Sequence, residues 1–468
     1  MSATTDRGTQ PDHRQRLLGY LTAARWFAGK GREAVLGSVT PLPWVTEAGE
    51  WPAVRFEVAE VSYPEESDGQ ETTAPELYQL AVSYRQAAEP GLAGAEIGPI
   101  EDPELGAVVA YDAMQDPEAC RIVLAALRQS RVLAGGAASV GFRLVSADAL
   151  SPELEPRVFT GQQSNTSVMF GDAAMLKLFR RLEIGRNLDI EVHESLSRAG
   201  VGDVAQLYGW VEASWPGADE SLLTADLAMV VEKLADAEDG WGLALDWLRS
   251  GRSLAPLAAD LGRALAEIHT ALRSAFPTAA VSGGDTARVM RRRLEVAAGI
   301  APALQPHLPG LNACFDALAH TQLVTQRVHG DFHLGQTLHT PTGWKIIDFE
   351  GEPVKSLAER SEPDSVWRDI AGMLRSFDYA AASVPGPDSR RWADDCRTAF
   401  LDGYTGGQTS SDQEAVLRAY VADKAIYEVV YEVRNRPDWV DIPLAAVAAI
   451  AAVSTDTDRS PTDERSTH

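Results

Sequence analysis

The most informative stretch of the chain is residues 328–352, which read VHGDFHLGQTLHTPTGWKIIDFEGE. Asp331 lies in the motif H-G-D-x-H, and Gln336 follows it five residues later. Asp348 comes directly after WKII, a short apolar segment that is typical of a strand. A carboxylate on a loop can position a hydroxyl group and accept its proton, and carboxylate and amide oxygens are ligands that Mg²⁺ accepts. The stretch therefore predicts a catalytic base at Asp331 and a metal site at Gln336 and Asp348.

The same order of side chains is found in protein-kinase-like phosphotransferases, in which H-R-D-x-x-x-x-N precedes D-F-G. This similarity implies transfer of a phosphoryl group from ATP to a small hydroxylated molecule. Glu350 stands where D-F-G has its glycine, and it can either support the metal site or be an ordinary solvated acid. The alternative for Asp331 is a loop aspartate that accepts backbone hydrogen bonds. The downstream strand and the D-F-E motif argue against that alternative.

Composition and charge exclude two classes of partner. The 468 residues carry a formal net charge of −25, and such a negative field repels nucleic acid and anionic membranes. The most apolar late run, residues 442–453, is too short to cross a bilayer. The polar N-terminus lacks the apolar segment of a signal peptide. We expect a cytoplasmic monomer whose partners are small molecules, with neither nucleic acid nor membrane among them.

The pattern along the chain predicts three domains. Short apolar runs between Gly- and Pro-rich gaps favour a β-rich unit in residues 1–110, of which residues 1–16 are expected to be disordered. Residues 111–233 are expected to form a second, mixed domain. Helical patterns dominate residues 234–453, and the Ser-, Thr- and Asp-rich residues 454–468 predict a disordered tail.

The middle domain carries the residues expected to hold a nucleotide. Lys177 lies on an apolar strand, where a lone charge is unfavourable unless it has a partner, and it is suited to pair with ATP phosphates. The alternative is an edge-strand lysine whose ammonium group reaches solvent. Glu191 on the following helix is our choice of partner for Lys177, in preference to Glu194. The polar turn before the strands is expected to cover the phosphates through Gln163, Ser164 and Asn165.

A further group of side chains lies on one predicted helix near the C-terminus. Lys424, Tyr427, Glu428 and Tyr431 recur at i, i+3, i+4 and i+7, which places them on one helical face. Aromatic rings can stack on a sugar ring while charged groups bind its hydroxyls. The face therefore predicts a sugar pocket, which Glu432 and Arg434 flank. The alternative is an ordinary amphipathic helix with half-buried tyrosines.

Seven motifs make the chain similar to the bacterial maltokinases and the actinobacterial glucosamine kinases, within the aminoglycoside-phosphotransferase-like superfamily. The motifs are RWFAGK, QSNTS, LKLFRR, HGDFHLGQ, IDFEGEP, RDIAGMLRSFDYAA and DKAIYEVVYEVRNRP. The resemblance covers most of residues 25–450. It implies an α+β fold of the eukaryotic protein-kinase-like, two-lobed type, with an N-terminal β-rich cap subdomain.

The resemblance also implies a role for individual residues. Asp331 is then the catalytic base, Gln336 and Asp348 hold Mg²⁺, and Lys177 binds the phosphates of ATP. The adenine is expected near Val231, Glu232 and Leu234, and Arg368 and Asp369 are expected to support the active-site loop. The residues expected to line the sugar pocket are Asp331, His333, Lys424, Tyr427, Glu428, Tyr431, Glu432 and Arg434.

Three departures from the maltokinase pattern favour glucosamine over maltose as the acceptor. Gln162 and Phe332 replace residue types that are usual in maltokinases, and the bulky Trp367 precedes the supporting helix, where it can shorten the sugar site. The leading hypothesis is a kinase that converts D-glucosamine and ATP to glucosamine 6-phosphate and ADP. The alternatives are a maltokinase that makes maltose 1-phosphate for α-glucan synthesis, an aminoglycoside-type phosphotransferase, and a non-catalytic pseudokinase.

Overall fold

The structure, a computed structural model, describes residues 13–64, 75–147, 149–159, 165–352 and 355–456. Its contacts divide the chain into two compact units. The first comprises Met1–Glu191 and Ala205–Ala235, and the second comprises Val192–Val204 and Asp236–His468. The three domain boundaries predicted from the sequence stay predictions.

The first unit begins with a six-stranded antiparallel sheet in the order β1–β2–β3–β5–β4, with β11 paired to β3. Its strands are β1 (Val35–Pro41), β2 (Ala53–Ser62), β3 (Glu76–Arg85), β4 (Glu96–Asp102), β5 (Gly106–Asp112) and β11 (Arg181–Leu182). Helix α1 (His13–Ala23) packs on this sheet through Leu17 and Leu21, both fully buried. The expected disorder of residues 1–16 is therefore corrected for residues 13–16, which form the first turn of α1; residues 1–12 lie outside the described residues.

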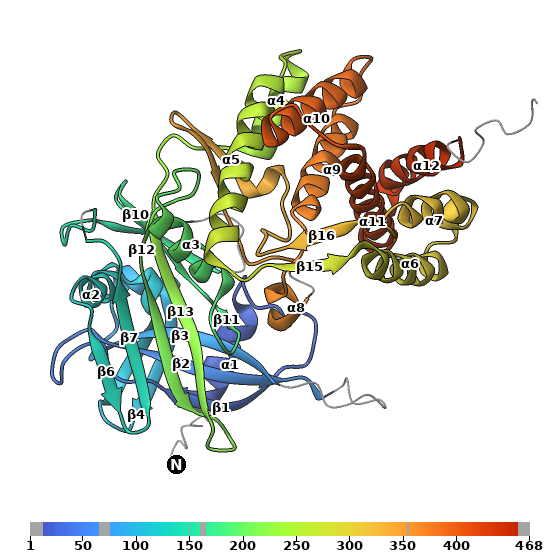
Figure 1. Ribbon diagram of the computed structural model, residues 1–468. Coiled ribbons are helices and arrows are strands. Elements are labelled where there is room, and N and C mark those ends of the chain that lie inside the picture. Colours follow the sequence, from blue (N-terminus) through green and yellow to red (C-terminus); the bar gives the residue numbers. More distant parts are fainter. Residues whose placement is uncertain (1–12, 65–74, 148, 160–164, 353–354, 457–468) are drawn as a thin grey trace, which may run out of the picture. The chain divides into compact units, whose positions relative to one another are not determined.

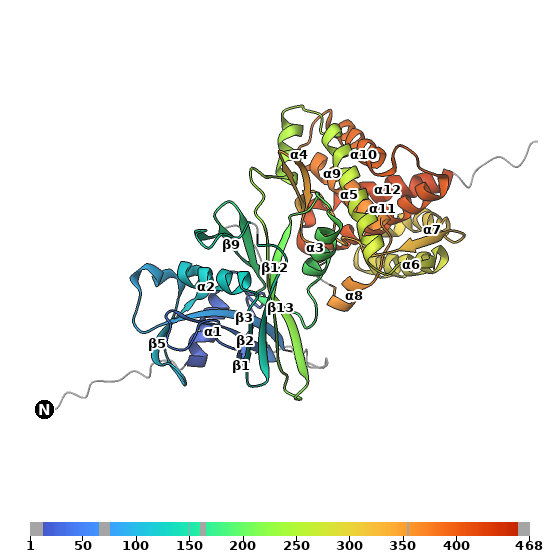
Figure 2. The same cartoon turned by 60° about the vertical axis from the view of Figure 1, so that its left-hand side comes forward.

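The second sheet of this unit has seven strands in the order β6–β7–β12–β13–β10–β9–β8 (Figures 1 and 2). The strands are β6 (Val132–Gly135), β7 (Ala138–Leu144), β8 (Pro156–Val158), β9 (Thr166–Phe170), β10 (Ala174–Leu178), β12 (Leu207–Pro216) and β13 (Leu222–Glu232). Between the two sheets in sequence, α2 (Pro117–Arg128) begins at Asp116, whose carboxylate accepts hydrogen bonds from the backbone N–H groups of Glu118 and Ala119. Helix α3 (Leu188–Ala199) follows β11.

The two sheets of the first unit share one core because β2 is buried on both faces. Its even-numbered residues Val54, Phe56 and Val58 belong to the cluster that also contains β7 residues. The rings of Phe56 and Phe142 lie 6.5 Å apart. This packing makes the six-stranded and the seven-stranded sheets a single unit.

Two motifs of the resemblance, RWFAGK and LKLFRR, meet in the first unit at the fully buried Arg180. Its guanidinium donates to Asp112 over 2.7 Å and lies 4.7 Å above the ring of Trp26. A buried guanidinium is tolerated only when it is paired and hydrogen-bonded. These residues therefore connect the segment after β10 to the first sheet.

The second unit is mainly helical. Its helices are α4 (Gly240–Arg249), α5 (Ala255–Ala275), α6 (Gly283–Ile300), α7 (Leu308–Asp316), α8 (Leu357–Ser361), α9 (Trp367–Ser383), α10 (Ser389–Thr405), α11 (Ser411–Asn435) and α12 (Asp441–Asp456). Short strands form two small sheets, β14 (Glu238–Asp239) with β17 (Thr337–Thr340) and β18 (Gly343–Ile346), and β15 (Ala279–Ser282) with β16 (Gln322–Thr325). Because α12 continues to Asp456, the expected disorder is corrected for residues 454–456, and residues 457–468 lie outside the described residues.

The most extensive contact between two helices of the second unit is between α5 and α10, which lie side by side in Figure 1. A Cβ atom at Gly262 would collide with the backbone of Phe400, and one at Gly403 would collide with the backbone of Ala259. Glycine at both positions therefore lets the two backbones approach closely. Helix α9 is buried along most of its length and forms the centre of this unit. Among the described residues, every helix is too short or too polar to cross a bilayer.

Candidate active site

The loop that carries Asp331 is held in place by Asp369, in the first turn of α9. The Asp369 carboxylate accepts hydrogen bonds from the backbone N–H groups of His329 (2.8 Å) and Gly330 (2.9 Å), and it lies 3.0 Å from His269 Nε2. Burial acts to raise the pKa of Asp369, but the hydrogen bond and charge of His269 outweigh it, so the pKa lies below its ordinary value. Gly330 has a φ of 86°, which favours glycine at this turn. Asp369 thus stays ionised and orders the loop.

Arg368 makes a second set of contacts with the same loop. Its Nε donates to the carbonyl oxygen of Gly330 over 3.1 Å, and its two terminal nitrogens pair with Asp364 (3.0 Å) and Glu352 (2.8 Å). The sequence predicted a supporting position for Arg368 and Asp369, and the structure places both against Gly330. Glu352, which the sequence reasoning missed, is the acid that connects Arg368 to the segment after D-F-E.

The Asp331 carboxylate faces two basic groups. Lys424 Nζ lies 3.5 Å from Oδ1, and His333 Nε2 lies 4.0 Å from Oδ2. Burial lowers the pKa of His333, and the charge of Asp331 only partly offsets this effect. The imidazole is therefore mainly neutral near pH 7. Asp331 keeps about a fifth of its side chain exposed, so it can reach a bound molecule.

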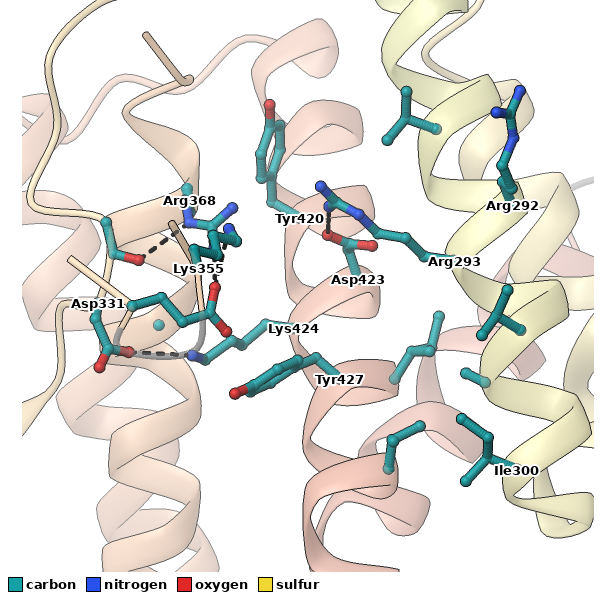
Figure 3. Close-up of a pocket in the computed structure, with 18 of the residues that line it drawn as sticks. Arg292, Arg293, Ile300, Asp331, Lys355, Arg368, Tyr420, Asp423, Lys424 and Tyr427 are labelled. Atoms are coloured by element: carbon teal, nitrogen blue, oxygen red, sulfur yellow. Dashed lines mark hydrogen bonds and ion pairs between the residues drawn. The ribbon is translucent and has the colours of Figure 1, made fainter. Parts of the chain in front are cut away.

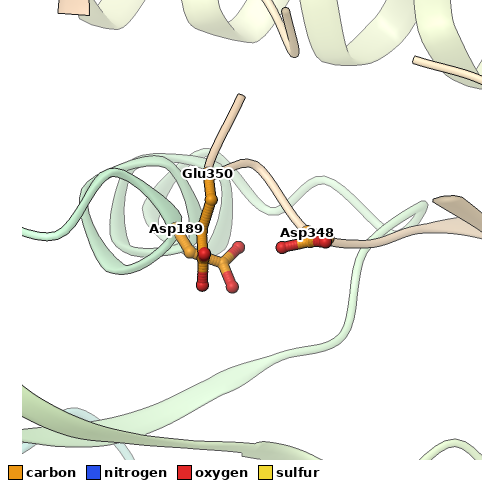
Figure 4. A group of neighbouring side chains, drawn as sticks. All are labelled: Asp189, Asp348 and Glu350. Atoms are coloured by element: carbon orange, nitrogen blue, oxygen red, sulfur yellow. The ribbon is translucent and has the colours of Figure 1, made fainter. Parts of the chain in front are cut away.

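The predicted metal ligands Gln336 and Asp348 are brought together in the second unit. Gln336 lies in the 3₁₀ turn Leu334–Gln336, and its side-chain amide nitrogen donates to Asp348 Oδ2 over 3.1 Å. Asp348 has a φ of 67°, a conformation that is strained for a non-glycine residue and is common at functional sites. The Asp348 carboxylate and the Gln336 side-chain amide lie close enough to bind one ion, and their oxygens are of the kind that Mg²⁺ prefers. Figure 4 draws Asp348 with Glu350, two residues further along the same segment.

In the first unit, Lys177 on β10 pairs with Asp189 in the first turn of α3, at 3.1 Å. The sequence reasoning named Glu191 and missed Asp189, which is 4% exposed against 20% for Lys177. Both Asp189 and Glu191 lie in the first turn of α3, so the sequence carried no signal that separates them. A role for Glu191, two residues further along α3, stays a prediction.

The other residues predicted to hold the nucleotide fall in two places of the first unit. Asn165 lies directly before β9, whereas Gln163 and Ser164 lie outside the described residues. Val231 and Glu232 end β13, and Leu234 follows just before the chain passes to the second unit. That these three residues hold the adenine stays a prediction.

A cavity of about 740 Å³ in the second unit brings together most of the predicted sugar face. Residues of that face that line it are Asp331, His333, Lys424, Tyr427, Glu428, Tyr431 and Glu432. Arg434 instead lines a neighbouring cavity. Two residues along a helix differ by about 200° around its axis, so Glu432 and Arg434 face different sides. The cavity receives Arg436 in place of Arg434.

Two of the buried carboxylates of this cavity, Glu428 and Glu432, are held by residues that the sequence reasoning missed. Arg375 Nε donates to Glu428 over 2.8 Å. The Tyr379 hydroxyl and Arg436 donate to Glu432 over 3.0 and 2.8 Å. Burial raises the pKa of Glu428 above its ordinary value although Arg375 partly offsets this effect. The two carboxylates thus have fixed positions, and the charge of Arg375 only partly offsets the cost of burying Glu428.

Aromatic rings line the same cavity from several elements. Tyr427 and Tyr431 stack along α11, with ring centres 6.4 Å apart, and Tyr379 of α9 stacks on Trp439 at 6.4 Å. Arg436 lies over both Tyr431 and Trp439. Tyr379 and Trp439 come from outside the predicted face, because their approach depends on how α9 and the segment after α11 pack.

A second cavity, of about 640 Å³, adjoins the first. Figure 3 shows its residues on α6, on α11 and on the loop of Asp331. The two cavities meet at Asp331, Glu352, Gly372, Lys424 and Tyr427, which line both. Asp331 can therefore reach molecules in either one.

Two family models match separate parts of the chain. The maltokinase N-terminal cap domain matches residues 20–116, and the phosphotransferase enzyme family matches residues 190–408. The chain is a phosphotransferase with a maltokinase-type cap. The resemblance and the enzyme class inferred from the sequence are thereby confirmed.

Two curated relatives carry the same name. This phosphotransferase is 29% identical over 344 residues to a glucosamine kinase of Streptacidiphilus jiangxiensis, covering 66% of this chain and 76% of the relative. It is 28% identical over 331 residues to a glucosamine kinase of Mycolicibacterium smegmatis, strain ATCC 700084 / mc(2)155, covering 64% of this chain and 81% of the relative.

Solved structures of similar fold include one crystal form of a glucosamine kinase, with a TM-score of 0.64 at 20% identity, covering 93% of this chain and 99% of that one. Another is a glucosamine kinase in complex with glucosamine, ADP and inorganic phosphate, with a TM-score of 0.63 at 21% identity, covering 94% and 99%. The predicted fold class, α+β and protein-kinase-like with an N-terminal β-rich cap, is confirmed.

Proposed function

We propose that this phosphotransferase is a sugar kinase that transfers the γ-phosphoryl group of ATP to the 6-hydroxyl group of D-glucosamine. Both curated relatives are glucosamine kinases, and a structural relative was solved with glucosamine and ADP. These relatives support the proposal, and the chemistry of the cavity beside Asp331 agrees with it.

The observation that carries the choice of an amino sugar is the excess of carboxylates in the 740 Å³ cavity. Four carboxylates line it against two cationic side chains: Asp331, Glu352, Glu428 and Glu432 against Lys424 and Arg436. An ammonium group offers three hydrogen-bond donors and a positive charge, which suits such a lining better than a hydroxyl does. The tyrosine faces provide the apolar surface on which a sugar ring can stack.

Asp331 is the proposed catalytic base. Its partly exposed carboxylate can accept the proton of the acceptor hydroxyl while the oxygen attacks the γ-phosphorus in line with the leaving ADP. Lys424, 3.5 Å away, holds the carboxylate in one orientation. When bound, Mg²⁺ held by Gln336 and Asp348 would neutralise charge on the ATP phosphates.

Lys177 is proposed to bind the α- and β-phosphates of ATP, with Asp189 fixing its ammonium group. We expect Lys177→Met to lower kcat/KM for ATP by about ten- to a hundredfold, the loss expected for one charge-assisted hydrogen bond. The KM for the acceptor should change little. Initial rates at varied ATP concentration measure the effect.

The matched control is Arg143→Met, which removes an exposed cation from the same sheet, where Arg143 pairs with Glu212 at 2.7 Å. An equal loss in both variants would show that Lys177 acts only through the stability of the sheet.

The raised pKa of Glu428 predicts a pH dependence that is specific to amino sugars. As the pH falls through that pKa, Glu428 gains a proton and loses the charge that attracts an ammonium group. We therefore expect the KM for glucosamine to rise as the pH falls, whereas the KM for glucose stays nearly constant. Initial-rate profiles for both sugars between pH 5 and 8 test this.

Glu428→Gln should remove the difference between the two profiles and lower the preference for glucosamine over glucose about tenfold. Because this preference is a ratio, it does not depend on the folded fraction of the variant. Glu414→Gln, an exposed change on the same helix, is the control. Parallel profiles in the native enzyme would contradict a role for Glu428 in binding the amine.

The proposed reaction as a whole is tested by an acceptor screen. The purified chain with ATP and Mg²⁺ is given glucosamine, glucose, maltose and kanamycin, ADP release is measured, and the phosphorylated carbon is assigned by NMR. Phosphorylation of glucosamine at O6 is the expected result. Turnover of maltose without glucosamine would replace the proposal by a maltokinase, and the absence of turnover on every acceptor would favour a non-catalytic role.

A further inference from the structure

The 640 Å³ cavity between α6 and α11 has an apolar floor that the proposed sugar kinase activity does not use (Figure 3). Val296, Ala297 and Ile300 of α6 face Ile426 and Val430 of α11 across it. Val296 is 62% exposed, although valine is usually buried. An exposed apolar surface beside a catalytic residue marks a ligand-binding site more often than a bare helix face.

The charge of this cavity is opposite to that of the whole protein. Seven cationic side chains and three carboxylates line it, in a chain of net charge −25. Each carboxylate already has a cationic partner. Arg293 pairs with Asp423 at 2.8 Å, and Asp331 and Glu352 pair with Lys424 and Arg368 as described above. Of the other four cations, Lys355 also pairs with Glu352 and Arg288 pairs with Asp285, so the positive charge that is available to a ligand comes from Arg292 and Arg434.

Two of the cations, Arg292 and Arg434, have neither an ion pair nor a hydrogen bond with any residue that the structure describes. Arg293 of α6 pairs with Asp423 of α11, so the neighbouring Arg292 lies at about the same height along α11 as Asp423. Arg434 lies 11 residues further along α11, about 16 Å at 1.5 Å per residue. The apolar floor extends between these two levels, so a small molecule on it has a free guanidinium group at either end.

We propose that this cavity binds an apolar organic anion, a small molecule with an aromatic or alkyl body and one carboxylate, sulfonate or phosphate group. The body covers the floor and the charged group pairs with a free guanidinium. An inorganic anion would leave the floor exposed, and a neutral apolar molecule would leave the guanidinium groups without a partner. Because Asp331, Lys424 and Tyr427 also line the sugar cavity, the bound anion lies beside the acceptor.

The test uses two dyes with the same ring system and different charge. The anion 1-anilinonaphthalene-8-sulfonate and the neutral N-phenyl-1-naphthylamine are titrated into the full chain, and fluorescence gives each Kd. We expect the double variant Arg292→Gln/Arg434→Gln to raise the Kd of the sulfonate about tenfold and that of the neutral dye less than twofold. Raising the salt concentration should weaken the binding of the sulfonate and leave the binding of the neutral dye unchanged.

Two further variants keep the proposal falsifiable. Val296→Glu changes an exposed position, so the fold should persist. It should weaken the binding of both dyes, because it places a charge on the apolar floor. Arg418→Gln removes an exposed cation of α11 outside the cavity and should leave both Kd values unchanged.

An unchanged sulfonate Kd in the double variant would overturn the proposal. An equal rise of the sulfonate Kd in Arg418→Gln would also overturn it, because dye binding would then depend on the overall charge of the surface. None of these measurements depends on turnover. A failure here therefore leaves the proposed sugar kinase activity untouched, and a failure of that activity leaves this binding test intact.

Discussion

Replacing Asp331 by asparagine is expected to lower kcat by roughly 10²–10⁴-fold, the range that general base catalysis contributes. Asparagine keeps the shape of the side chain and can still accept a hydrogen bond from Lys424, which lies 3.5 Å from the carboxylate in the native protein. It cannot accept the proton of the acceptor hydroxyl, so only positioning and charge stabilisation by other groups remain. Single-turnover and steady-state rates with glucosamine measure the loss, and the KM values should change less than kcat.

The control for Asp331→Asn is Asp388→Asn, an exposed change before α10. Both variants should have nearly the native melting temperature, because Asp331 is partly exposed and its ion pair is long. A kcat within threefold of the native value would show that Asp331 is not the base. The same result would favour a loop aspartate that only accepts hydrogen bonds.

Asp369→Asn is expected to produce the second large effect, by moving the loop of Asp331. One carboxylate receives the N–H groups of His329 and Gly330 and also faces His269. An amide has a single acceptor oxygen, so at least one buried donor loses its partner, which costs about 1–3 kcal/mol in the free energy of unfolding. Because a shift of about 1 Å in a catalytic group can cost a hundredfold in rate, we expect kcat to fall about 10²-fold.

A purely structural role for Asp369 would lower the melting temperature without changing kcat of the folded enzyme. Rates are therefore measured well below the melting transition and normalised to the folded fraction. Asp260→Asn, an exposed change on α5, is the control. A normalised kcat equal to that of the native enzyme would contradict the positioning role, whatever the change in stability.

Much of the candidate site could be predicted because its residues are close in sequence. Asp331, Gln336 and Asp348 lie within 18 residues, and a turn followed by a short hairpin is enough to bring Gln336 to Asp348. The face of Lys424, Tyr427 and Glu428 followed from the 3.6-residue period of one helix. Arg434, predicted to flank this face, lines the neighbouring cavity because it lies on another side of the same helix.

Other partners could not be predicted because they come from elements distant in sequence. Tyr379 of α9 lines the 740 Å³ cavity, and Arg375 of the same helix donates to Glu428 there. The spacing within either helix carries no information about which faces meet. Asp189 was missed as a partner of Lys177 for the same reason, since the rotation of α3 against β10 decides which acids point to the strand.

The sequence by itself determined the chemistry of this protein, because the order H-G-D, amide, strand and D-F-E is a local pattern whose spacing specifies a phosphotransfer site. Only the tertiary structure decided what surrounds that site. The packing of α9 and α6 against α11 divides the space at Asp331 into an acid-rich aromatic cavity and an apolar cationic one. The physical reason is that the side chains on one helix follow from its period, whereas the cavity they line depends on which helices pack against it.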